Sequence, residues 1–187
     1  DNARALLLAA VLAEADAPQL PEIVTNRFAA FVQHAWNPDN RRFRNFMSYD
    51  RRWLEDVGSD DSHGRTLWAL AVCAASGADD ARQRWADALF GAALASTEAL
   101  TSPRSWAFTL LALDAHCRRV PDDVSADRLR RVLADRLMAL LAANTRKDWV
   151  WFEPVLAYDN ARLPEALIRT GAATHTSAYT TAGLQSL

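Results

Sequence analysis

Apolar side chains recur at the three- and four-residue spacing of amphipathic helices along almost the whole chain. The pattern predicts helices at about residues 2–15, 20–36, 62–75, 79–96, 102–120, 125–144 and 159–170, and an eighth that begins near residue 177. Helix-breaking residues separate them, with Pro18 after the first helix, Pro38 after the second and Gly171 as the C-terminal stop of the seventh. Since no strand core is predicted, the fold class is all-α.

Two irregular segments, residues 40–62 and 145–158, interrupt the helices and mix aromatic with charged side chains. Their aromatic residues are Phe43, Phe46, Tyr49, Trp53, Trp149, Trp151, Phe152 and Tyr158. Part of the first segment is expected to pair as a short hairpin. Loops of this length without regular structure are uncommon and often functional.

The helices alternate in character along the chain. The first helix, residues 62–75 and residues 102–120 are rich in Ala and Leu on all sides, as buried helices are. Residues 79–96 and 125–144 carry Arg and Asp on one face, as outer helices do. Alternating inner and outer helices in antiparallel pairs predict a helical solenoid or a closed α/α toroid.

A short internal repeat marks the starts of the predicted inner helices. Residues 1–4 read Asp-Asn-Ala-Arg, and residues 159–162 repeat them. Residues 61–65 and 102–106 occupy the corresponding places in the other two pairs. In a toroid these starts point to one end, so their loops would form one funnel. A simpler alternative for each Asp is that it caps the free N–H groups of its helix.

Composition narrows the function classes. With 21 basic and 23 acidic residues the net charge is −2, which disfavours a nucleic-acid partner. No apolar run approaches the ~20 residues of a membrane span, and the first fifteen residues fit an amphipathic helix better than a signal peptide, so we expect a cytoplasmic location. Cys73 and Cys117 lie in apolar helical stretches without metal-ligand spacing, and glycine is scarce, so no metal and no cofactor are expected.

Seven tryptophans are the compositional excess, and several lie beside charged residues. Sugars stack their C–H faces on indole rings while carboxylates and arginines bind the hydroxyls. Glu153, beside Trp151 and Phe152, would then have the raised pKa of a general acid; the alternative is a packed tryptophan pair with a surface glutamate. Residues 49–55 are similar in kind, with surface Arg–carboxylate pairs as their alternative.

Glycoside hydrolysis needs two carboxylates, ~5–5.5 Å apart for retention and ~6.5–9.5 Å apart for inversion. The candidate catalytic residues are Glu153, Asp61 and Asp159. The candidate substrate-binding residues are Tyr49, Arg52, Trp53, Asp60, His63, Arg65, Arg104, Trp106, Trp149, Trp151, Tyr158 and Arg162.

The runs at residues 45–53, 58–65, 101–107, 151–153 and 158–164 resemble bacterial helical domains of the six-hairpin glycosidase-like superfamily. Those domains often occur with glycosyltransferases or bear that name. The resemblance covers nearly the whole chain and implies an (α/α)6 barrel of twelve helices. Residues 1–187 would then form a single, incomplete toroid domain, a fragment of a longer one. A second copy, a partner or the missing toroid segment would cover its open edge.

The family motifs do not specify a reaction, but the clustering of Trp, Asp and Arg in the loops favours a carbohydrate-active protein that binds an oligosaccharide or sugar and acts on glycosidic bonds as a hydrolase or transferase. The alternatives are a glycan-binding module without catalysis and a helical scaffold that assists a glycosyltransferase. An epimerase-type isomerase shares the fold, but it would need catalytic histidines at inner-helix ends, where only His63 is placed.

Overall fold

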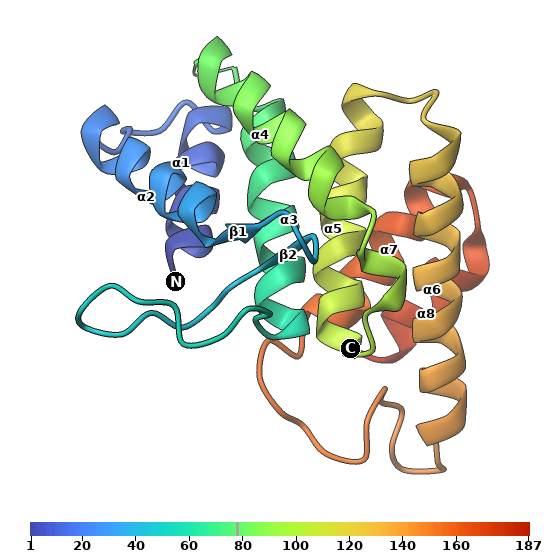
Figure 1. The fold of residues 1–187 in the computed structure, drawn as a ribbon. Helices are drawn as coiled ribbons and strands as arrows, with labels where there is room; N and C mark the ends of the chain where they lie inside the picture. The colour runs from blue at the N-terminus through green and yellow to red at the C-terminus, as the bar shows by residue number, and fades with distance from the viewer. Residues whose placement is uncertain (78) are drawn as a thin grey trace.

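The computed structural model describes residues 1–77 and 79–187, and over these residues the chain is almost entirely helical (Figure 1). The helices are α1 (Asn2–Glu14), α2 (Glu22–Ala35), α3 (Asp60–Ala75), α4 (Asp80–Leu94), α5 (Pro103–Arg119), α6 (Val124–Asn144), α7 (Arg162–Thr174) and α8 (Ser177–Gln185). A short 3-10 helix, Thr97–Ala99, precedes α5. The predicted all-α class and the eight predicted helices are confirmed.

Local capping explains where several helices begin. Ser59 accepts a hydrogen bond from the Ser62 amide before α3, Asp79 accepts from two amides of α4, and Asp123 accepts from the Ala126 amide of α6. Pro103 starts α5, where its missing N–H is not needed. These caps satisfy amides that no turn of helix can satisfy.

The predicted end of α7 at Gly171 is wrong. The helix continues to Thr174, and His175 takes the left-handed conformation, with a φ of 52°, at its C-terminus. Gly171 instead lets α8 approach closely, because a Cβ there would lie 2.6 Å from the Thr180 amide nitrogen. Gly171 is therefore needed for the close packing of α7 and α8, and it does not end α7.

The helices form four antiparallel hairpins in a row: α1–α2, α3–α4, α5–α6 and α7–α8. Along the inner side, α1 packs on α3, α3 on α5, and α5 on α7. The outer helices α2, α4 and α6 each pack on the inner helix of their own hairpin, and α8 packs on α7. This arrangement matches the predicted alternation of inner and outer helices, while closure into a six-hairpin ring remains a prediction.

Helices α3 and α5 form the centre of the core, and most of their residues are buried. Their crossing is close at Gly64, where a Cβ would lie 2.8 Å from the Ser105 carbonyl oxygen. Helix α1 differs from the predicted fully buried helix, since Leu8 and Val11 are exposed on its outward side. Only Leu6, Ala9 and Ala10 of α1 are buried, against α2 and α3.

The two irregular segments lie at the same end of the helices: in Figure 1 the first extends to the left of the lower end of α3, and the second lies below α3 and α5. Strands β1 (Trp36–Asn37) and β2 (Arg42–Phe43) pair antiparallel, with Trp36 opposite Phe43. Met47 and Trp53 form a further isolated bridge. The predicted hairpin therefore exists, but it begins in residues 36–37, ahead of the predicted segment.

Candidate functional site

The N-terminal ends of all four inner helices meet at one place. Asp159, just before α7, accepts hydrogen bonds from Arg4 of α1 at 3.1 Å and from Arg65 of α3 at 2.8 Å. The Ser102 hydroxyl at the start of α5 donates to Asp61 of α3. These contacts join residues up to 155 positions apart in the chain.

A pocket of about 150 Å³ lies among these helix ends, and we call it the arginine pocket. It is lined by Arg4, Leu7, Arg65, Trp68, Phe108, Asp159 and Arg162. The Arg162 guanidinium lies over the Trp68 ring at 4.8 Å, and the Arg65 guanidinium lies over the Phe108 ring at 4.8 Å. Aromatic rings therefore form part of its wall and hold two of its cations in place.

Two further hollows adjoin the arginine pocket. The first, about 100 Å³, is called the aspartate pocket and is lined by Asp1, Ala3, Arg4, Asn45, Ser59, Asp61, Ser62, Arg65 and Tyr158. The second, about 430 Å³, is called the loop groove and runs between α1, α2, α3 and residues 43–46. Because Arg4 and Arg65 line both pockets and Arg65 also lines the groove, the three form one cleft.

Arg104 fixes the aromatic loop of residues 145–161 against the start of α5. Its buried guanidinium contacts both carboxylate oxygens of Glu153, at 2.9 and 2.8 Å, and its Nε donates to the Tyr158 carbonyl oxygen. The Tyr158 ring lies between the guanidiniums of Arg104 (4.9 Å) and Arg65 (5.2 Å). The contact to Oε1 is a hydrogen bond and the contact to Oε2 is an ion pair only, and together they hold the Glu153 carboxylate against Arg104.

This geometry changes the interpretation of Glu153. The sequence placed aromatic rings around it, whereas the structure adds a guanidinium that contacts both of its oxygens. A proton donor would have to break that pair, so Glu153 is better placed to position the loop than to donate a proton. The Trp149 indole N–H also donates to the Glu153 carbonyl oxygen at 2.8 Å, which strengthens the same positioning contact.

Asp159 is held as an anion. Burial alone would raise the pKa of its carboxyl group, but the hydrogen bond and charge of Arg65, together with those of Arg4, outweigh burial and hold the pKa below its ordinary value. The backbone of Asp159 is left-handed, with a φ of 50°, a conformation that Asp tolerates better than most residues. Asp159 is therefore an ionised carboxylate at neutral pH, at the centre of the arginine pocket.

Asp60 has a structural role outside the pockets. It forms an ion pair with Arg42 at 2.8 Å and accepts hydrogen bonds from the backbone amides of Thr101 and Ser102. Burial opposes ionisation, but these amides and Arg42 lower the pKa of Asp60 below its ordinary value. Asp60 therefore connects the loop before α3 to the loop before α5. It does not line the cleft, where it was predicted to contact substrate.

His63 lies inside the protein and not in the cleft. Its side chain has no exposed surface, its ring packs on Phe43, and its Nε2 lies 3.2 Å from the Ala93 carbonyl oxygen. Burial lowers the pKa of His63 to about 4, so the ring is neutral at neutral pH. The predicted ligand contact of His63 is therefore wrong in this structure, because the residue faces the core between α3 and α4.

Three predicted tryptophans also serve packing. Trp151 is 8% exposed and makes an edge contact with Phe152 in the core. The Trp106 indole donates to the Leu100 carbonyl oxygen and lies under Arg136 of α6. Trp53 packs on α2 through Phe31 and His34. None of these three rings lines the cleft, where a sugar was predicted to stack on them.

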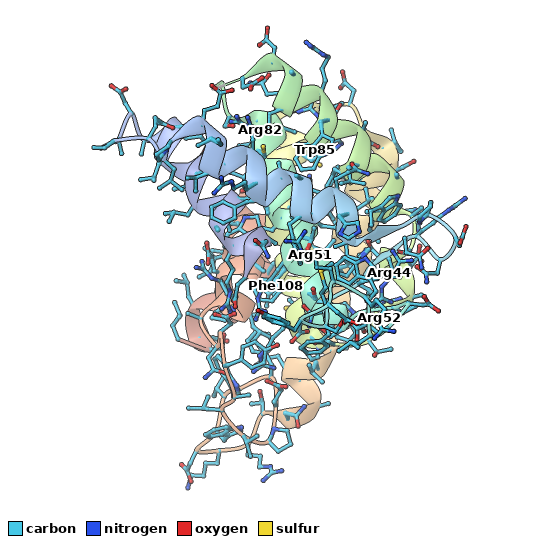
Figure 2. The ribbon with its side chains drawn as sticks, turned by 60° about the vertical axis from the view of Figure 1, so that its left-hand side comes forward. Arg44, Arg51, Arg52, Arg82, Trp85 and Phe108 are labelled. Carbon is cyan, nitrogen blue, oxygen red and sulfur yellow. The ribbon has the colours of Figure 1, made fainter. Side chains whose placement is uncertain are left out.

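The tip of the loop before α3 is open to solvent. Tyr49 is fully exposed, and Arg52 pairs with Asp50. Figure 2 shows Arg51 and Arg52 of this loop well apart from Arg82 on α4. Tyr49 and Arg52 are thus outside the lining of the cleft, and the Arg52–Asp50 pair fits the alternative of a surface Arg–carboxylate pair.

The structure brings together Asp61, Arg65, Tyr158, Asp159 and Arg162, all predicted from the sequence. Of the residues that line the arginine pocket, sequence reasoning missed Leu7 and three with polar or aromatic side chains, Arg4, Trp68 and Phe108. A signal existed for these last three. Arg4 closes the first copy of the repeated tetrapeptide, Trp68 follows Arg65 by three positions, and Phe108 follows Arg104 by four, so both aromatics share a helix face with an arginine.

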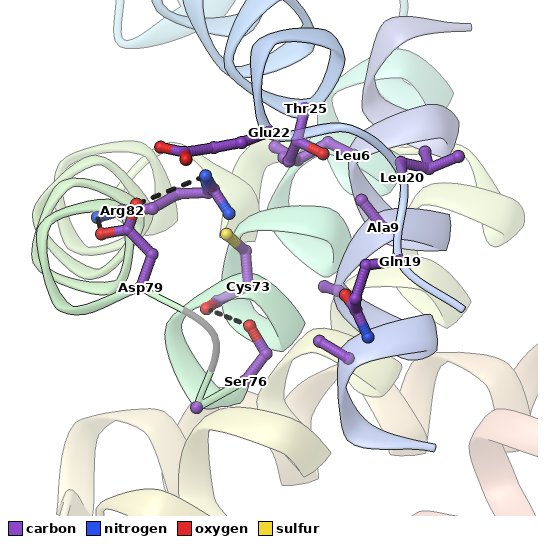
Figure 3. Close-up of a pocket in the computed structure, with 13 residues that line it drawn as sticks. Leu6, Ala9, Gln19, Leu20, Glu22, Thr25, Cys73, Ser76, Asp79 and Arg82 are labelled. Atoms are coloured by element: carbon purple, nitrogen blue, oxygen red, sulfur yellow. Dashed lines mark hydrogen bonds and ion pairs between the residues drawn. The ribbon is translucent and has the colours of Figure 1, made fainter. Parts of the chain in front are cut away.

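A larger pocket of about 580 Å³ lies at the other end of the helices, between the ends of α1 and α3 and the starts of α2 and α4 (Figure 3). Most of its polar side chains form hydrogen bonds or ion pairs with residues close to them in the sequence. Gln19 donates to two carbonyl oxygens near the end of α1, Ser76 donates to the Cys73 carbonyl oxygen, and Arg82 pairs with Asp79. None of the predicted site residues lines it, so we place the candidate site in the cleft.

No protein-family model matches this chain, and no curated protein and no solved structure matches it. Among residues 1–77 and 79–187, no helix has both the length and the apolar character needed to cross a membrane. In the same residues, no cluster of three or more His, Cys, Asp or Glu side chains has a metal-binding arrangement. Inferences about function therefore rest on the cleft itself.

Proposed function

We propose that this chain is a carbohydrate-active protein that binds a saccharide in the cleft and acts on a glycosidic bond there. The observation that carries the proposal is the lining of the two adjoining pockets, where Asp61, Asp159, two shared arginines and the ring of Tyr158 meet. Hydroxyl groups of a sugar need several donors and acceptors in a concave site with apolar walls, and the cleft offers both.

Two carboxylates have different environments in this proposal. Asp159 is ionised between Arg4 and Arg65, so it suits a nucleophile or a stabiliser of positive charge rather than a proton donor. Asp61 lines the neighbouring pocket and is bound by one neutral hydroxyl, that of Ser102. Asp61 is therefore our candidate for the proton donor, in place of Glu153.

The test is a screen of neutral and charged oligosaccharides, followed by tryptophan fluorescence for binding and by chromatography for product. We expect Asp61→Asn and Asp159→Asn to abolish turnover, and Asp61→Asn to retain most of the binding. Asp122→Asn, in the loop before α6 at the far end of the helices, is the matched control and should behave as wild type. Turnover that survives both cleft variants would refute the assignment of the carboxylates.

A second candidate is a glycan-binding module without catalysis that assists a glycosyltransferase. It is favoured by one observation: each of the three predicted catalytic carboxylates already accepts a hydrogen bond or an ion pair from the protein. Fluorescence quenching by a saccharide without any product would support this candidate. A helical scaffold would show neither quenching nor product.

A further inference from the structure

We propose that the saccharide carries an acidic group, a carboxylate or a phosphate, and that Arg4, Arg65 and Arg162 bind this group in the arginine pocket. This inference rests on the proposed function and specifies its substrate class. It starts from the electrostatics of the inner helices. The positive ends of α1, α3, α5 and α7 meet in the cleft, and each of these helices carries an arginine within its first two turns.

Arginine at a helix N-terminus opposes the helix dipole, so this arrangement costs stability unless anions balance it. Helices α1 and α5 have no acidic residue in the first turn. Three arginines and one carboxylate, Asp159, line the arginine pocket. Arg162 also pairs with Glu165, and Arg4 lies 3.9 Å from the fully exposed Asp1, but neither carboxylate lines the pocket, so the positive excess is confined to the lining itself.

The guanidiniums are oriented before any ligand binds. Arg162 lies over Trp68, and Arg65 lies between the rings of Phe108 and Tyr158. Stacking covers the faces of a guanidinium and leaves its N–H edges for hydrogen bonds. A planar or tetrahedral oxyanion is the group that such edges bind best.

Most of the N–H groups of these three guanidiniums donate no hydrogen bond within the described part of the protein. Among the described residues, Arg4, Arg65 and Arg162 each make one hydrogen bond, although a guanidinium has five N–H groups. The Nε of Arg65 is buried without a hydrogen-bond partner in the same part of the chain. A ligand oxyanion would satisfy these donors, which a neutral sugar hydroxyl does less strongly.

The position of the pocket supports an acidic saccharide rather than a free anion. The arginine pocket adjoins the aspartate pocket, which offers the carboxylate of Asp61, the amide of Asn45 and the hydroxyl groups of Ser59 and Ser62. One sugar ring could thus place its charged substituent on the arginines while its hydroxyls contact the neighbouring polar groups. A free anion would use only the first set.

The experiment measures calorimetric affinity for three matched ligands: a neutral oligosaccharide, its uronic-acid counterpart and its phosphorylated counterpart. We expect at least one acidic ligand to bind about tenfold to a hundredfold more tightly than the neutral one, from added charged hydrogen bonds. The tighter of the two acidic ligands identifies the source of the oxyanion. Added salt should weaken the acidic ligand more than the neutral one.

Arg4→Gln is the preferred variant, because the Arg4 side chain is half exposed and its loss should not prevent folding. It should remove most of the preference for the acidic ligand, and Arg162→Gln should do the same. Arg84→Gln, an exposed arginine on α4, is the matched control and should keep the preference. Equal affinity for acidic and neutral ligands overturns this inference alone, and so does a preference that survives both variants. Binding of neither kind of ligand overturns the proposed function as well.

Discussion

His63 should make the stability of this protein depend on pH, and the size of the effect follows from its burial. Its imidazole is fully buried, and its Nδ1 has no hydrogen-bond partner among the described residues. Burial and the nearby charge of Arg42 lower the pKa of His63 from 6.5 to about 4, against weaker opposing effects of Ala93 and Asp60. Protonation in the folded protein therefore places a charge in the core with little compensation.

The sign follows from where each state binds the proton. The unfolded chain protonates His63 below pH 6.5, whereas the folded chain protonates it only below about pH 4. This contribution to stability is complete above pH 6.5 and is lost as the pH falls from 6.5 to about 4. At about 1.4 kcal/mol for each pH unit, the loss across the window is about 3 kcal/mol.

Urea unfolding followed by far-ultraviolet circular dichroism at the two ends of this window measures the loss. His63→Gln has no titrating ring, so its free energy of unfolding should fall by about 3 kcal/mol less than that of wild type. His34→Gln removes an exposed imidazole from α2 and should change with pH as wild type does. An equal fall in wild type and His63→Gln would refute the reasoning, and an NMR titration of the His63 ring gives the same answer independently of unfolding.

Three further predictions concern the frame of the cleft. Arg104→Met leaves the Glu153 carboxylate without its buried partner, so the free energy of unfolding should fall by about 3 to 5 kcal/mol in urea, and Arg104→Lys should restore only part of it. Gly64→Ala should cost about 1 to 3 kcal/mol because the α3–α5 crossing has no room for a Cβ, while Gly91→Ala, in open space on α4, should raise the melting temperature slightly. Asp159→Asn should lower stability by about 1 kcal/mol at neutral pH. Because the pKa of Asp159 is lowered in the folded state, the wild-type advantage should be present above about pH 4 and be lost as the pH falls further.

The helices could be predicted from the sequence because their signal is local. Apolar spacing acts within a few residues, and the structure confirms the helices that it predicts; the caps at Ser59, Asp79 and Asp123 are equally local. The alternation of inner and outer helices could also be predicted, since it follows from which faces carry Arg and Asp. Gly171 misled the boundary of α7 because a glycine at a close helix contact and one at a helix stop look alike in a sequence.

The site could be predicted only in part, because its chemistry depends on contacts across long separations. Nothing near Glu153 in the sequence shows that Arg104, 49 positions earlier, holds its carboxylate. His63 has charged neighbours along the chain, but its helix face points to Phe43 and α4. The convergence of residues 61, 65, 159 and 162 was predictable because the repeat marks equivalent helix starts.

The pairing of Arg4 with Asp159 shows that the row of inner helices is curved. Neighbouring helices lie about 8 to 10 Å apart, so three steps from α1 to α7 along a straight row would separate their axes by about 24 to 30 Å. Arg4 nevertheless reaches Asp159, three positions before α7, at 3.1 Å. This pairing brings the starts of α1 and α3 to the residue that precedes α7, while closure of the row into a toroid stays a prediction. The acidic residue of the second tetrapeptide thus pairs with the arginine of the first. The arrangement that gathers the arginines in the arginine pocket also places the Asp159 carboxylate there. An acidic ligand would accept hydrogen bonds from the guanidinium N–H groups that do not donate to Asp159.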